Sequence, residues 1–167
     1  PCTVNVVVHV VYFNEEANVT DGQVFNQIDI LNKRLNHLNS DTSLLRDQFL
    51  PITGNPSGIF FQLAEIDPQG NPTNGILRVQ TNRDGFGNSN EFLSEDVKYT
   101  SEGGSSAWDT QRYLNIWVCD TKDETGMPTL AGYAIPPANL PNWPGSFEDI
   151  IDGVVIQWEY FGDDNDN

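Results

Sequence analysis

Two histidines and two cysteines are the side chains of this 167-residue chain with the most direct capacity for catalysis. A catalytic zinc site takes three protein ligands, most often histidines, and leaves one position for water. His9 falls within a run of β-branched residues and His37 within a helical pattern, and neither stands in an H-E-x-x-H frame. We interpret both as structural, and we assign no catalytic residue and no zinc ligand to this chain.

The two cysteines offer thiol chemistry instead. Cys119 could act as a nucleophile with a histidine as its base, but no local motif supports the pair, and a thiol in a buried strand is more often inert. Cys2 precedes the first predicted strand and Cys119 ends the third. If these strands are parallel, about nine residues of strand, or roughly 30 Å, separate the thiols. A disulfide needs Cα atoms within about 7 Å, so we predict that the two do not pair.

Carboxylate and amide oxygens are more abundant than nitrogen or sulfur ligands. Asp163, Asn165 and Asp166 alternate like the opening of a calcium loop. The glycine and the distal glutamate of such a loop are missing, so a solvated terminus is the simpler interpretation and calcium remains a weak candidate. A second acidic cluster at residues 120–124 is interpreted as a solvated loop.

Charge and length narrow the classes of partner. The chain has 24 acidic and 8 basic residues, a net charge of −16, which argues against nucleic acid and anionic membranes as partners. No stretch approaches the roughly 18 apolar residues of a membrane helix. The length predicts a single domain over residues 1–167. No leader pattern precedes Pro1 and Cys2, so we expect a trimmed product.

A helix is the clearest element that could position these residues. Thr20 and Gln23 have the spacing of a capping box. Apolar residues then recur at steps of four, three, four and three: Val24, Ile28, Leu31, Leu35 and Leu38. This period predicts an amphipathic helix that packs one stripe against a sheet.

Five main strands are predicted, at residues 4–13, 58–66, 113–119, 130–135 and 152–158, and a short one could form at 76–81. The first is almost continuously apolar, which is typical of a strand buried on both faces of a parallel or mixed sheet. The helix between the first two strands suits a right-handed crossover. The pattern therefore predicts an α/β fold.

Several segments, in this order, resemble the pappalysin family of metzincin zinc metallopeptidases. They are residues 6–12 (VVVHVVY), the helix at 24–36, 58–64 (GIFFQLA), 67–76 (DPQGNPTNGI), 103–104 (GG), 107–110 (AWDT), 113–119 (YLNIWVC), 130–134 (LAGYA) and 152–156 (DGVVI). The resemblance covers nearly the whole chain. It implies an upper, N-terminal subdomain: a five-stranded, mostly parallel, twisted sheet with one antiparallel edge strand and backing helices.

The resemblance also implies a binding site. The antiparallel strand would be the short one at residues 130–135, and it would bind an extended peptide substrate as an added strand. The residues concerned are Leu130, Ala131, Gly132, Tyr133 and Ala134. Small residues would let the substrate backbone approach closely. Without the resemblance, an ordinary edge strand is the simpler interpretation.

One departure from the family is large. There, the last of these strands leads into a helix with H-E-x-x-H-x-x-G-x-x-H, which supplies three zinc ligands and the general base. This sequence has no such motif after Trp158. We therefore expect the N-terminal part of a secreted zinc metallopeptidase, inactive alone, whose zinc and C-terminal subdomain come from outside this chain. The alternative is a non-catalytic peptide-binding or structural module that kept the sheet.

Overall fold

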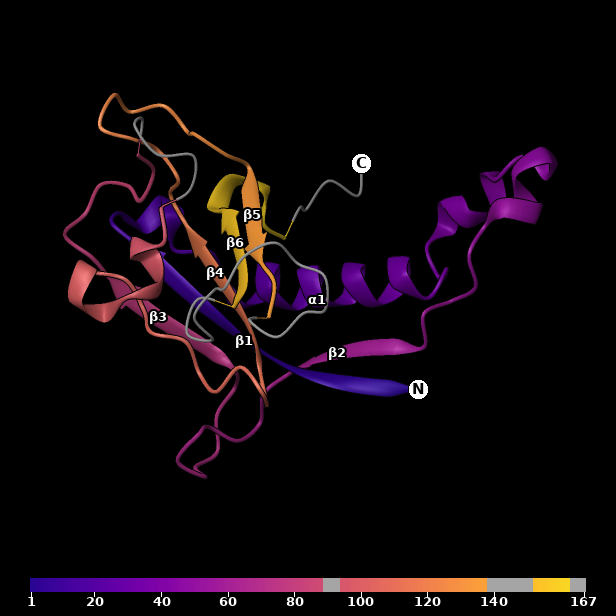
Figure 1. The fold of residues 1–167 in the computed structure, drawn as a ribbon, viewed down its shortest axis with the longest axis horizontal. Coiled ribbons are helices and arrows are strands. Elements are labelled where there is room, and N and C mark those ends of the chain that lie inside the picture. The colour runs from indigo at the N-terminus through magenta and orange to yellow at the C-terminus, as the bar shows by residue number, and fades with distance from the viewer. Residues whose placement is uncertain (89–93, 138–151, 163–167) are drawn as a thin grey trace.

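The computed structural model describes residues 1–88, 94–137 and 152–162 (Figure 1). One sheet dominates it, with a single long helix, α1, along one face. The strands are β1 (Cys2–Tyr12), β2 (Ile59–Leu63), β3 (Ile76–Gln80), β4 (Leu114–Cys119), β5 (Gly132–Ile135) and β6 (Gly153–Gln157). The helix α1 spans Asp21–Leu35, and the 3-10 turns are η1 (Glu15–Ala17), η2 (Ser40–Leu44), η3 (Asp47–Ile52), η4 (Asp96–Lys98), η5 (Thr100–Glu102) and η7 (Trp158–Tyr160).

The sheet confirms the predicted α/β class. Its order is β2-β1-β4-β6-β5, with β3 also paired to β1. Among the strands of the described residues, all pairings are parallel except β5 with β6, so β5 is an antiparallel strand at the edge, as the family resemblance implies.

The described residues form six strands: the five main strands that were predicted and β3, which corresponds to the short strand that could form at residues 76–81. β2 pairs with residues 2–6 of β1 and β3 with residues 8–12, while β4 pairs with residues 6–10. Since β4 occupies one side of β1, both β2 and β3 must lie on the other, end to end. The chain leaves the sheet after Ala64, whose N–H donates to Val6 at 2.8 Å, and returns at Gly75, whose carbonyl accepts from Val8 at 2.9 Å. The sheet is therefore five strands wide, and β2 and β3 share the position beside β1.

The buried faces of β1 explain its apolar sequence. Val6, Val8 and Val10 are fully buried on the face where Val24 and Ile28 of α1 pack. The other face carries Val7, His9 and Val11 and is covered by the segment between β3 and β4. Because both faces are covered, the strand has no polar stripe.

The parallel pairing of β1 and β4 also determines how far apart the two cysteines lie. Cys119 lies one residue beyond the pair Val10–Val118, at the opposite end of β1 from Cys2. Cys2 is exposed and Cys119 is buried, and both are free thiols. The two thiols therefore lie at opposite ends of parallel strands, which is the arrangement on which the prediction of no Cys2–Cys119 disulfide was based.

The capping box is confirmed at the start of α1. The Thr20 hydroxyl accepts from the Gln23 N–H at 3.2 Å, and the Gln23 side chain accepts from the Thr20 N–H at 2.9 Å. The helix ends at Leu35, earlier than the predicted stripe, which reached Leu38. The reason is His37, whose φ of 57° is left-handed and turns the chain away.

Asn32 of α1 and Asn36, the residue that follows the helix, close the outer edge of β2. Asn32 donates to the Phe61 carbonyl at 2.8 Å and accepts from its N–H at 2.7 Å. One turn later, Asn36 donates to the Ile59 carbonyl at 2.9 Å and accepts from the Gly58 N–H at 3.0 Å. A strand edge is a row of unpaired donors and acceptors, and these side chains occupy it.

Asn32→Ala should lower the free energy of unfolding by about 2 kcal/mol, because two hydrogen bonds are lost and two partly buried backbone groups lose their partners. Urea denaturation of the purified chain measures this. Asn5→Ala is the matched control, since it removes one exposed bond, to Gln62 at 2.9 Å, from the same strand pair. Its cost should stay within about 0.5 kcal/mol. Equal costs for the two variants would contradict a stabilising role for Asn32 at the edge of β2.

Candidate peptide-binding edge

The outer side of β5, which no other strand in the described part of the chain pairs with, can accept another chain. Its register pairs Gly132 with Ile156 and Ala134 with Val154, and the Gln157 N–H donates to the Ala131 carbonyl at 2.9 Å. In an antiparallel ladder this bond makes Gly132 and Ala134 the residues whose N–H and C=O point away from β6. Among the described residues no strand pairs with that side.

The five sequence-predicted residues divide into two groups. Gly132, Tyr133 and Ala134 belong to β5, which starts later than predicted, whereas Leu130 and Ala131 precede it. The Leu130 carbonyl accepts from the Thr121 hydroxyl at 2.6 Å, and the Ala131 carbonyl is bonded to β6. The carbonyls of Leu130 and Ala131 are thus already engaged.

Gly132 is required by packing within the sheet. A Cβ built at this position would lie 2.7 Å from the Val155 carbonyl oxygen of β6. The structure therefore supplies a reason for glycine here that differs from the predicted approach of a substrate backbone. Ala134 keeps its outward N–H and C=O, so it is the more direct candidate for contact with a peptide.

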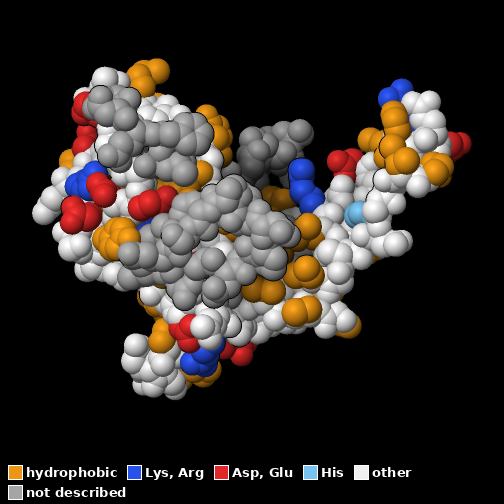
Figure 2. Space-filling view, viewed as in Figure 1, with side chains coloured by type: hydrophobic (Ala, Val, Ile, Leu, Met, Phe, Trp, Pro, Cys, Tyr) orange, Lys and Arg blue, Asp and Glu red, His pale blue; other side chains and the backbone are white. Residues whose placement is uncertain are grey.

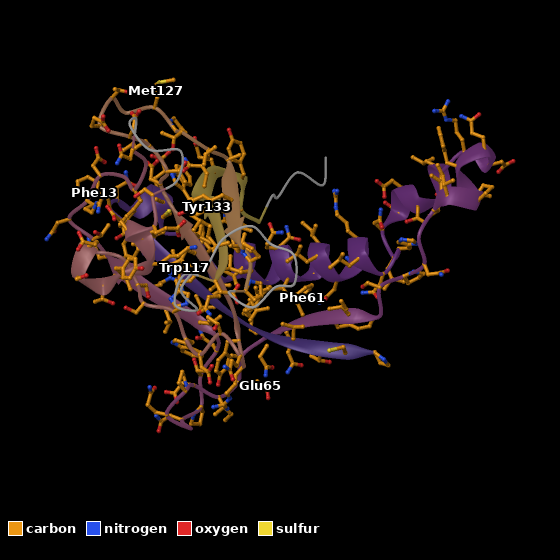
Figure 3. The ribbon with its side chains drawn as sticks, viewed as in Figure 1. Phe13, Phe61, Glu65, Trp117, Met127 and Tyr133 are labelled. Carbon is orange, nitrogen blue, oxygen red and sulfur yellow. The ribbon has the colours of Figure 1, made fainter. Side chains whose placement is uncertain are left out.

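Tyr133 anchors the edge strand from behind (Figure 3). Its hydroxyl donates to the Ser94 carbonyl, and its ring lies over the Lys98 ammonium, with 5.3 Å from Nζ to the centroid. Burial raises the pKa of the Tyr133 hydroxyl, so it stays protonated and remains a donor. The fixed side chain places the middle of β5 against the segment between β3 and β4.

Lys98 is a fully buried cation in this layer. Its Nζ lies 2.7 Å from the Glu95 carboxylate and 5.2 Å from the Trp117 ring centroid. Burial lowers the pKa of Lys98, while Glu95 acts in the opposite direction. A charge is tolerated here because it has a partner carboxylate and two aromatic faces.

A polar network lies under the same face of the sheet. Asn115 donates to the Trp108 carbonyl at 3.0 Å and accepts from its N–H at 2.8 Å, which fixes the orientation of the amide. His9 Nε2 must therefore donate to the Asn115 oxygen, at 3.0 Å, so neutral Nδ1 accepts from the Ser105 hydroxyl, at 2.8 Å. The His9 ring stacks on Trp117, with 5.0 Å between centroids.

Burial keeps His9 neutral. It lowers the pKa of His9 from 6.5 to about 4, although the hydrogen bond that His9 donates to Asn115 acts against the shift. Both ring nitrogens are engaged and the side chain has no exposed surface. His9 is therefore a structural residue, as predicted, and is not placed to ligate a metal.

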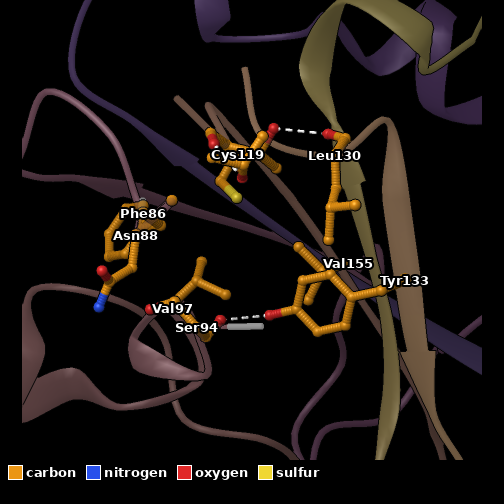
Figure 4. A pocket seen from close by; sticks show the side chains of 11 residues that line it. Phe86, Asn88, Ser94, Val97, Cys119, Leu130, Tyr133 and Val155 are labelled. Carbon is orange, nitrogen blue, oxygen red and sulfur yellow. Dashed lines mark hydrogen bonds between the residues drawn. The ribbon is translucent and has the colours of Figure 1, made fainter. Parts of the chain in front are cut away.

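Cys119 is equally unsuited to nucleophilic chemistry. It is fully buried, and burial raises the pKa of its thiol well above the ordinary range. The cavity beside it is lined by Phe86, Val97 and Tyr133 and has a volume of about 10 Å³ (Figure 4). That is near the space of one water molecule, so a substrate does not fit behind β5.

The metal candidates find no support in the described residues. Asp163, Asn165 and Asp166 lie outside them. Within the part of the chain that the structure describes, no three His, Cys, Asp or Glu side chains are grouped to hold a metal ion. The acidic cluster at 120–124 forms internal contacts: Asp123 accepts from the Thr125 N–H at 2.8 Å and Asp120 lies 3.4 Å from Lys122. The described residues do not fit a zinc site.

Sequence reasoning missed Lys98, Ser105 and the anchoring role of Tyr133. A signal was present for part of this layer, because His9 interrupts the apolar run at residues 6–11 and Asn115 is the one polar residue of β4. Such residues require buried partners, but the sequence does not say which.

Neither a family model nor a curated protein sequence matches this chain. Solved structures of mirolysin from Tannerella forsythia do. A promirolysin variant superposes with a TM-score of 0.83 and 39% identity over 98% of this chain and 48% of that one. Mature mirolysin in complex with a cleaved peptide gives 0.82 and 38% over 98% and 55%.

The fold is that of part of a metallopeptidase. The chain spans about half the length of the mirolysin chains it matches. Because the match covers 98% of this chain, it includes β5 and the segments that pack on both faces of the sheet. None of the described helices is long and apolar enough to cross a membrane.

Proposed function

We propose that this chain is the N-terminal subdomain of a secreted zinc metallopeptidase of the pappalysin type. The observation that carries the proposal is the 39% identity to promirolysin over 98% of this chain, together with an antiparallel edge strand whose outer side pairs with no other strand among the described residues. The subdomain would hold an extended peptide, and a C-terminal subdomain would supply the zinc site.

The role of the chain's own residues is to bind and orient. Outward N–H and C=O groups of Gly132 and Ala134 would pair with a substrate backbone, which fixes its direction and register. Tyr133 and Lys98 hold the strand from behind. Zinc, when bound by the complementary part, would activate water for attack on the peptide bond.

Support for a peptide ligand comes from one of the relatives. Mature mirolysin has been solved with a cleaved peptide. The edge of β5 offers a row of backbone groups rather than a deep cavity, as expected for a site that recognises extended main chain. Calcium at Asp163, Asn165 and Asp166 stays a prediction, as does the absence of nucleic acid and membrane partners.

A change at the open edge tests the site. Ala134→Pro removes one outward N–H and leaves the bonds to β6 in place, so peptide binding should fall about tenfold or more while the free energy of unfolding changes little. Titration of the isotope-labelled chain with an extended hexapeptide, followed by NMR shifts at residues 132–134, measures this.

Ala134→Ser is the matched control, since it keeps the N–H and should bind like the parent chain. Peptide-induced shifts that spare residues 132–134, or that survive Ala134→Pro unchanged, would overturn the edge as the site. The rival function is peptide binding without catalysis. It predicts the same peptide-induced shifts at residues 132–134, but in a native protein that holds no zinc.

A further inference from the structure

Apolar surface is concentrated on one projecting part of the molecule. We call residues 38–57, which connect α1 to β2 through η2 and η3, the arm. It stands away from the sheet beyond the end of α1 (Figure 1). Every residue from 40 to 57 is exposed, and the described side chains of η2 and η3 contribute nothing to the core.

Eight of the thirteen exposed large hydrophobic residues in the described part of the chain lie on the arm or directly beside it. They are Leu35, Leu38, Leu44, Leu45, Phe49, Leu50, Ile52 and Ile59. Leu44 and Ile52 are 78% and 80% exposed. Figure 2 shows hydrophobic side chains gathered there. A soluble monomer rarely shows a contiguous apolar patch of this kind unless a partner covers it.

The base of the arm is fixed, so the patch is presented in a defined direction. The Ser57 N–H donates to the Leu35 carbonyl at 2.9 Å, and the Gly58 N–H donates to Asn36 at 3.0 Å. His37 turns the chain outward with its left-handed φ of 57°. These bonds hold the two ends of the arm together at the end of α1.

The arm carries little of the chain's charge. It holds Arg46 against Asp41 and Asp47, a net charge of 1 − 2 = −1. The remainder then carries −16 + 1 = −15. A groove of about 600 Å³ lies at the base, lined by Arg34, His37, Leu44 and Leu45 among others.

We infer that the arm is the docking surface for the complementary half of a mirolysin-type chain. Residues of the arm fall within the 98% of this chain that matches mature mirolysin, and 45% of that mirolysin chain lies outside the match. An apolar surface that is exposed only in the isolated half is what an interface between two halves of one domain leaves behind. The inference rests on the proposed function.

The probe is the part of mature mirolysin that this chain does not match, co-expressed with the chain as a separate polypeptide. The arm variant is Leu44→Ser, Leu50→Ser and Ile52→Ser combined. The matched control is Phe13→Ser, Phe25→Ser and Met127→Ser, three exposed hydrophobic residues away from the arm. All six side chains are exposed, so both variants should fold like the parent chain.

We expect the arm variant to bind the complementary part roughly 100-fold more weakly and the control to bind within about threefold of the parent. Hydrogen exchange at residues 40–57 should slow in the parent complex. Equal binding of the two variants, or unchanged exchange in the arm, would overturn the inference.

If the separate parts do not associate, a single-chain fusion of this chain with the same mirolysin part gives the deciding measurement. Arm amides that exchange as fast in the folded fusion as in the isolated chain would overturn the inference. A dimer of the isolated chain that forms through the arm and persists in excess complementary part would identify a second copy as the occupant and would also overturn it.

Peptide cleavage separates this inference from the proposed function. If the complex forms through the arm and binds zinc but cleaves no peptide, the proposed function is wrong and the docking surface stands. If the complex cleaves peptide while the arm amides stay unprotected, the docking surface is wrong and the proposed function stands.

Discussion

Trp117→Ala should lower the free energy of unfolding by about 4 kcal/mol, in the upper range for loss of a buried aromatic residue. Trp117 has no exposed surface and lies in the cluster with Val11, Phe86 and Val155. Its indole N–H also donates to the Ser105 carbonyl at 2.7 Å. The substitution removes packing, leaves that carbonyl without its donor and opens space beside the buried Lys98.

Urea denaturation at neutral pH measures the loss, and Trp117→Phe is the matched variant. Phenylalanine keeps most of the packing and an aromatic face for Lys98, so its cost should be about 1–2 kcal/mol. A cost for Trp117→Ala below about 1.5 kcal/mol would show that the layer behind β5 does not hold the sheet together.

Acidification from pH 6.5 to 4 should destabilise the chain by about 3 kcal/mol through His9 alone, since one pKa unit corresponds to about 1.36 kcal/mol. The folded state keeps His9 neutral down to about pH 4, whereas an unfolded histidine takes up a proton below pH 6.5. The unfolded state therefore binds more protons in this interval, and stability rises with pH across it. The stability that neutral His9 allows is present above pH 6.5, and most of it is lost by pH 4.

Chemical denaturation at several pH values between 4 and 7.5 tests this. His9→Gln should remove most of the slope, whereas His37→Asn should keep it, because asparagine tolerates the left-handed backbone at that position. Asp67 and Asp123 have lowered pKa values, so their contribution begins to fall near the acidic end of this interval and is lost mainly below pH 4. A slope that survives His9→Gln would contradict the assignment.

Local patterns predicted the elements that depend on neighbouring residues. The capping box of Thr20 and Gln23 and the buried face of α1 follow from spacing along one helix. The apolar run of β1 predicted a strand covered on both faces. These features need no knowledge of distant partners.

The remaining features depend on contacts between residues far apart in the chain. β3 completes the edge shared with β2 only because β1 is long enough to pair with both. The His9 network joins residues 96 and 106 positions apart. Composition treats Lys98 as a surface charge, although its side chain is fully buried beside Glu95. Pairing of this kind is decided by tertiary packing, which a single sequence does not display.

The candidate site was predicted in outline through the family resemblance, and its details came from the register. The edge position of β5 matches the expectation, whereas the outward groups of Gly132 and Ala134 follow only from the bond between Gln157 and Ala131. The exposed arm was not predicted, because Leu44, Leu50 and Ile52 lie in a proline-containing loop pattern without helical or strand period.

We propose that this chain is one part of a longer zinc metallopeptidase, and the intact mass of the protein as its source organism makes it is the deciding measurement. We expect a native chain well above the 18.6 kDa of these 167 residues, continuing into a zinc-binding histidine motif. A native chain of 18.6 kDa would contradict it and leave a peptide-binding module without catalysis.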